Sequence, residues 1–153
     1  TLIFSSRAGK ILRYQGMLTL FLLSLSALLL TPLHLLWCLG VACYANRAIH
    51  DPLVHADFGR AAQLPVELSG FFGLPLVAAG VASAAFGSEP WVRVASGILA
   101  VFPLLPVFHF DPIRGMDPWR VRWSAGLAFG GGLVLIFVLL YGHYHGFRQM
   151  MIH

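Results

Sequence analysis

Residues 123–147 read WSAGLAFGGGLVLIFVLLYGHYHGF, a run of 25 positions without Asp, Glu, Lys or Arg. A transmembrane helix needs about 20 mostly apolar residues, because the hydrocarbon core of a bilayer is about 30 Å thick and an α-helix rises about 1.5 Å per residue. Three further charge-free runs, of 33, 21 and 17 residues, occupy positions 14–46, 68–88 and 94–110. The sequence therefore predicts an all-α, polytopic membrane helix bundle.

The overall composition supports this interpretation. Of the 153 residues, 58% are hydrophobic and 10% are charged, whereas about a quarter of an average soluble domain is charged. So few charges cannot cover a water-soluble globule, and we expect a single membrane domain over residues 1–153. The formal net charge of +4 is spread along the chain without a basic run. We therefore expect the lipid bilayer and other membrane subunits as partners, and no nucleic acid.

We expect four membrane-spanning helices, at about 17–45, 64–86, 91–109 and 119–144. Before them, residues 1–16 interleave basic and apolar positions, which predicts an amphipathic segment at the membrane surface. A targeting sequence removed from upstream of this segment is a further expectation. Near the end of the third span, Pro103 and Pro106 should distort the last helical turns, because Pro lacks a backbone N–H.

Pro32 leaves the number of spans open. Proline in a helix interior removes a hydrogen bond and crowds the preceding turn, so the first predicted helix should be kinked there. A complete break at Pro32 would give five spans, but the two halves are short for a bilayer. With four spans the ten Lys and Arg residues divide five against five, and with five spans they divide eight against two. The positive-inside rule therefore favours five spans, helix length favours four, and the orientation stays open.

Small residues gather on two of the predicted spans. Gly70 and Gly73 lie in the second span, and Gly126 and Gly130 form a GxxxG motif in the fourth. Glycine lets the backbones of two helices approach closely, and packing of this kind is a main source of helix association in membranes. We expect these glycines to pack against helices of the same bundle or of a partner subunit.

Histidines and aspartates gather in two predicted loops, 46–63 and 109–118. Both four and five spans place these loops on the same side of the membrane, so His50, His55 and His109 should face one compartment. Imidazole and carboxylate groups are ligands for divalent metals, which makes these three histidines candidate metal ligands. The alternative is that they are solvated or cap neighbouring helices.

Haem b would need axial histidines at similar depth in the membrane. His34 is the ionisable residue placed deepest in a predicted span, while His143 and His145 lie at the end of the fourth. These three are the candidate cofactor ligands. A second histidine at the depth of His34 is missing from the other predicted spans, so we expect His34 to be a structural residue with a partner in the protein.

Three segments carry a resemblance to a known family. They are ELSGFFG at 67–73, FHFDP at 108–112 and AFGGGLVL at 128–135. In this order they resemble the DoxX family of small four-helix membrane proteins, over about half of the chain. The resemblance implies an association with respiratory complexes that reduce quinone or oxidise quinol.

A second likeness lies at the end of the chain. The segment GFRQ at 146–149, preceded by His143 and His145, is similar to a His-containing segment of the membrane anchors of succinate dehydrogenase. That resemblance implies a haem b ligand in this region. Here the position four residues before Gly146 is Gly142 rather than His, and the position of the following acid is His153.

The sequence contains no evident pair of catalytic carboxylates, nucleophile motif or phosphate-binding loop. Together with the resemblance, this predicts a non-catalytic accessory subunit of a membrane-embedded respiratory complex, with a quinone or lipid site at its border. One alternative is a haem b- or quinone-binding anchor of an oxidoreductase. The other is a small transporter, which is disfavoured because Glu67 is the only acid near a span. The expected location is the mitochondrial inner membrane or the bacterial plasma membrane.

Overall fold

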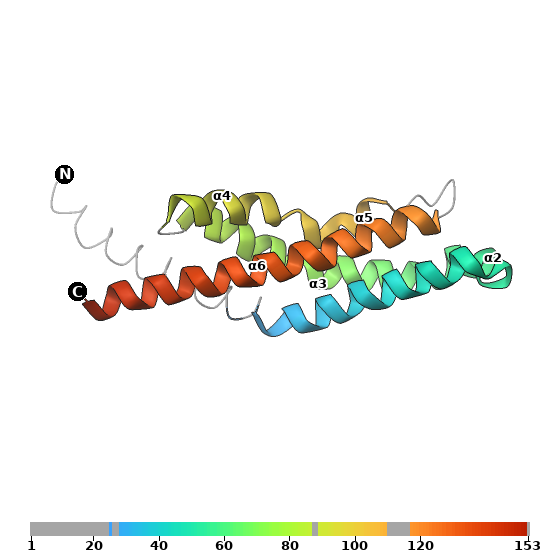
Figure 1. Cartoon of the computed structure of the whole chain (residues 1–153), viewed down its shortest axis with the longest axis horizontal. Coiled ribbons are helices and arrows are strands. Elements are labelled where there is room, and N and C mark those ends of the chain that lie inside the picture. Colours follow the sequence, from blue (N-terminus) through green and yellow to red (C-terminus); the bar gives the residue numbers. More distant parts are fainter. Residues whose placement is uncertain (1–24, 26–27, 87–88, 110–116, 153) are drawn as a thin grey trace, which may run out of the picture.

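The computed structural model describes residues 25, 28–86, 89–109 and 117–152 (Figure 1). The predicted surface segment at 1–16 and the start of the first predicted span lie outside these residues. Every regular element in the described part of the chain is an α-helix or a 3₁₀-helix. The predicted all-α class is therefore confirmed.

Among the described residues, four helical segments are long and apolar enough to cross a bilayer, and the protein is an integral membrane protein. Their bounds are Leu28–His50, Gln63–Ala84, Pro90–Phe108 and Pro118–Gly142. The first of these helices runs through Pro32 without interruption, so the break that five spans require is absent there. This helix ends at His50 rather than near the predicted residue 45.

The region predicted as a loop at 46–63 is instead mostly helical. The first helix reaches His50, and α2 (Pro52–Ala61) follows after a single residue. Asp51 caps α2, because its Oδ1 accepts a hydrogen bond from the Leu53 amide at 3.0 Å and Pro52 occupies the first turn. Aspartate as N-cap followed by proline is a typical helix start, so the loop prediction was wrong at a place where the sequence carried the opposite signal.

The third crossing is not a single helix. It consists of α4 (Pro90–Leu99), the 3₁₀-helix η1 (Phe102–Leu104) and the short α5 (Leu105–Phe108). Pro103 and Pro106 supply no amide hydrogen, so the regular hydrogen-bond ladder fails at these positions. The predicted distortion at the end of this span is confirmed.

The last helix is much longer than predicted. α6 extends from Pro118 to Ile152, 35 residues, or about 52 Å at about 1.5 Å per residue. The sequence predicts its end near residue 144. Figure 1 shows that the C-terminal part of α6 continues past the first turns of α4.

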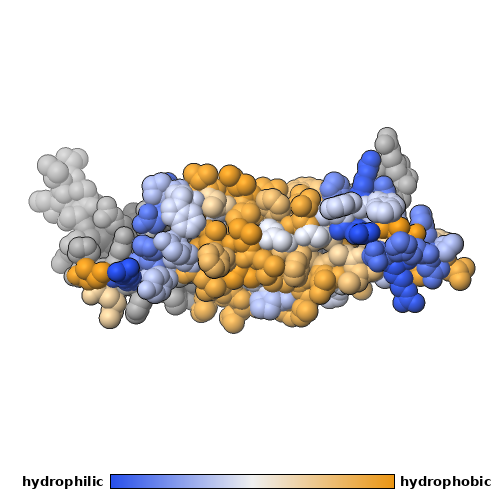
Figure 2. Space-filling model, in the orientation of Figure 1, coloured by the Kyte–Doolittle hydropathy of each residue, from blue (hydrophilic) through white to orange (hydrophobic). Residues whose placement is uncertain are grey.

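The third crossing lies between α3 (Gln63–Phe86) and α6. Its segments α4, η1 and α5 pack against both of these helices. A cluster of apolar side chains near α2 joins the first helix to α2, α3 and α6. Its buried members are Val41, Ala45, Ala48, Phe58, Ala62, Val66, Val121 and Ala125. On the face seen in Figure 2, hydrophobic residues form a belt between two more hydrophilic ends, as expected for a bundle that spans a bilayer.

Candidate functional site

The two predicted packing glycines of α3 face the irregular third crossing. A Cβ atom at Gly73 would lie 2.9 Å from the carbonyl oxygen of Pro103, and one at Gly70 would lie 2.7 Å from a methyl carbon of Val107. Both distances are shorter than a carbon atom tolerates in ordinary packing. The absence of side chains at Gly70 and Gly73 is therefore what lets η1 and α5 lie directly on α3.

The glycines of α6 divide into two faces. Gly131 is buried against the ring of Phe102, and a Cβ atom at Gly132 would lie 3.2 Å from Leu35 of the first helix. By contrast, a Cβ atom at Gly126 or Gly130 would meet no neighbour within 4 Å among the described residues. Of these four glycines, Gly131 and Gly132 contact other helices of the described chain, whereas the GxxxG positions Gly126 and Gly130 are open.

His34 lies inside the bundle, as the sequence predicts. Its side chain is fully buried, and its Nε2 is 3.3 Å from the sulfur of Cys38, one helical turn further along. The same sulfur is 3.8 Å from the hydroxyl of Ser69 on α3. These three side chains form a small polar contact between the first helix and α3. Sequence inspection could have found the His34–Cys38 pair from its spacing of four residues.

The structure does not bring the three candidate cofactor ligands together. Leu35, next to His34, packs at the level of Gly132 of α6. His143 and His145 follow Gly132 by 11 and 13 residues, which corresponds to about 16–20 Å along the helix. The ring of His145 instead lies 4.8 Å from that of Tyr141. A single haem cannot be bound by His34 together with either of the other two.

The candidate metal ligands lie at one end of the bundle without forming a cluster. His50 ends the first helix, His55 lies in α2 and His109 follows α5, and all three side chains are exposed. Figure 1 places α2 at the same end as α5 and the start of α6, in agreement with the predicted common side. Across the described residues, no three His, Cys, Asp or Glu side chains are grouped closely enough to hold a metal ion.

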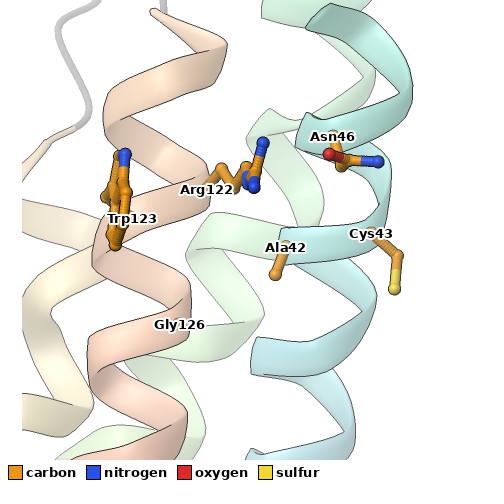
Figure 3. A pocket seen from close by; sticks show the side chains of 6 residues that line it. All are labelled: Ala42, Cys43, Asn46, Arg122, Trp123 and Gly126. Atoms are coloured by element: carbon orange, nitrogen blue, oxygen red, sulfur yellow. The ribbon is translucent and has the colours of Figure 1, made fainter. Parts of the chain in front are cut away.

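A surface groove that the sequence analysis did not find lies between the first helix and α6, at the α2 end of the bundle (Figure 3). Its volume is about 370 Å³, and its lining residues are Ala42, Cys43, Asn46, Arg122, Trp123 and Gly126. Figure 3 shows the Arg122 side chain extending from α6 toward the first helix at about the level of Asn46. The two walls are some 80 positions apart in the chain, so a local sequence motif could not have predicted this groove.

Comparison of the chain with protein-family models, with curated proteins and with solved structures gave no match.

Proposed function

We propose that this protein is a non-catalytic accessory subunit of a membrane-embedded respiratory complex, and that it docks onto another transmembrane subunit through the outer face of α6. The observation that carries the proposal is the outward-facing pair Gly126 and Gly130. Both positions are open, since a Cβ atom at either would meet nothing within 4 Å among the described residues.

The other glycines of the bundle show how a helix can pack against this face of α6. Gly70, Gly73 and Gly131 are each filled by a residue of η1 or α5, which is how small residues act inside membrane bundles. Gly126 and Gly130 lie four positions apart on α6 and have no such neighbour in the described chain. A helix from another subunit could approach them as closely as η1 approaches α3.

The respiratory setting is supported by the resemblance of residues 67–73, 108–112 and 128–135 to the DoxX family. The absence of evident nucleophile or phosphate-binding motifs in the sequence supports an accessory role for the chain. A quinone or lipid bound beside the subunit, and the mitochondrial inner or bacterial plasma membrane as its location, belong to the same proposal.

The test replaces Gly130 by Leu and measures which membrane proteins co-purify with the tagged chain. A branched side chain at this position should hold a partner helix away, so partner recovery, measured by quantitative mass spectrometry, should fall severalfold. Gly40→Leu is the matched control, because Gly40 is also a helical glycine with open space around it in the described structure.

The two variants must be compared at equal amounts of tagged protein in the membrane. Equal recovery of partners with Gly130→Leu and with the wild type would exclude the outer face of α6 as the docking surface. Recovery of partners that contain no redox subunit would retain the docking surface and reject the respiratory setting.

A further inference from the structure

The groove between the first helix and α6 lies near the ends of these two membrane-spanning helices. Arg122 is four residues after the start of α6, and Asn46 is four residues before the end of the first helix, so each is about 6 Å from its helix end. Two neighbouring tryptophans, Trp119 and Trp123, are exposed. Exposed Trp at a span end is typical of the membrane–water interface.

Arg122 is the charged group of the groove, and in the described structure its charge is not neutralised. Its guanidinium carbon lies 5.4 Å from the centre of the Trp119 ring. No ion pair joins Arg122 to a carboxylate of the described residues, whereas the nearby Arg120 lies 3.7 Å from Asp117. The five N–H donors of Arg122 are therefore available to an anion, and a guanidinium matches two phosphate oxygens at once.

The groove continues from this polar end into apolar surface. Gly126 and Ala42 keep the space beside Arg122 open. Further into the membrane, large apolar side chains on both helices are exposed; these are Leu36 and Leu39 on the first helix and Leu127 and Leu133 on α6. A ligand that fits must join an anionic group at the interface to hydrocarbon chains beneath it.

We propose that an anionic phospholipid binds in this groove, with its phosphate at Arg122 and Asn46 and its acyl chains beside Gly126. An anionic headgroup is favoured over a zwitterionic one, because a choline or ethanolamine cation would lie near the positive charge of Arg122. The lipid would lie at the Gly126 end of the α6 face proposed for docking, so this proposal deepens the accessory role; the purified chain without partners suffices for its test, which therefore fails or succeeds separately from partner docking.

The test measures lipid binding to the purified full chain in detergent by native mass spectrometry. Phosphatidylglycerol and phosphatidylcholine with the same acyl chains are compared. We expect the wild type to bind phosphatidylglycerol about tenfold more tightly, and Arg122→Gln to remove most of this preference. Arg120→Gln is the matched control, because it removes an equal charge from a residue that does not line the groove.

Gly126→Leu provides a second variant that leaves every charge in place. It should reduce binding of phosphatidylglycerol by filling the groove, and the open space at this position lets the chain fold with the larger side chain. An unchanged lipid preference in Arg122→Gln, or an equal loss in Arg120→Gln, would overturn the proposal. So would glycerol phosphate competing as strongly as the intact lipid, because the site would then recognise a soluble phosphate.

Discussion

Replacing Gly73 by Ala tests the close approach of η1 to α3. The new Cβ atom would lie 2.9 Å from the carbonyl oxygen of Pro103 and 3.2 Å from the carbonyl carbon and the Cβ of the same residue. The backbone of η1 would have to move, since its oxygen cannot rotate away as a side chain does. Overpacking of this kind costs about 1–3 kcal/mol. Alanine also gains about 0.5–1 kcal/mol over glycine in a helix, which opposes part of that cost.

Gly40→Ala separates the two contributions. Gly40 is exposed in the first helix, and a Cβ atom there meets no neighbour within 4 Å among the described residues. This variant should show only the gain from alanine. The difference between the two variants therefore measures the clash alone, and we expect Gly73→Ala to be less stable than Gly40→Ala by about 1–3 kcal/mol.

Both proteins can be unfolded by SDS from mixed micelles, with helix content followed by far-UV circular dichroism. The free energies of unfolding are then compared under identical conditions. Equal stability of the two variants, or greater stability of Gly73→Ala, would mean that Pro103 does not lie against α3 at this position. The arrangement of the third crossing described above would then be wrong.

Three further predictions concern other parts of the chain. Asp51→Ala should reduce stability by about 1 kcal/mol through loss of the α2 cap, measured by the same SDS titration, while Asp57→Ala in the middle of α2 should have little effect. In sealed vesicles and a cysteine-free background, His50→Cys and His109→Cys should react with an impermeant thiol reagent from the same side, and labelling from opposite sides would mean that two spans do not separate them. The purified chain should show no b-type reduced-minus-oxidised absorbance; a haem spectrum that His34→Ala abolishes would favour an electron-transferring anchor instead.

The sequence predicted the class of fold, because this depends on long charge-free runs, and it left the number of spans open between four and five. It also predicted the distortion of the third crossing, since the effect of Pro103 and Pro106 on the helical ladder is local. The predicted end of the first helix was wrong, because it rested on where the charge-free run ends. Arg47 ends a charge-free run, yet the helix continues to His50 and is followed at once by the capped α2.

The candidate site was less predictable, for a geometric reason. Which face of α6 packs inward depends on the neighbouring helices, so the GxxxG spacing alone could not show that Gly131, rather than Gly130, meets Phe102. The burial of His34 followed from the high cost of an unpaired polar group in hydrocarbon. The contact of its neighbour Cys38 with Ser69 could be known only once α3 was seen to pack against the first helix.

The length of α6 also has a consequence for how its backbone is held. A helix of about 52 Å would need a tilt of more than about 50° to lie wholly within a hydrocarbon layer of about 30 Å, whereas membrane helices tilt by about 0–40°. Part of α6 must therefore lie outside the hydrocarbon layer, where water is present among or beyond the lipid headgroups. Within the bilayer each amide keeps its carbonyl partner, because no other partner is available. Beyond the bilayer, water competes for every one of those groups, and a short helix there is only marginally stable by itself. One continuous helix is thus exposed to two solvents, hydrocarbon and water. Amide hydrogen exchange along α6 should be slow in the first and faster in the second, and the change in rate should mark the boundary between them.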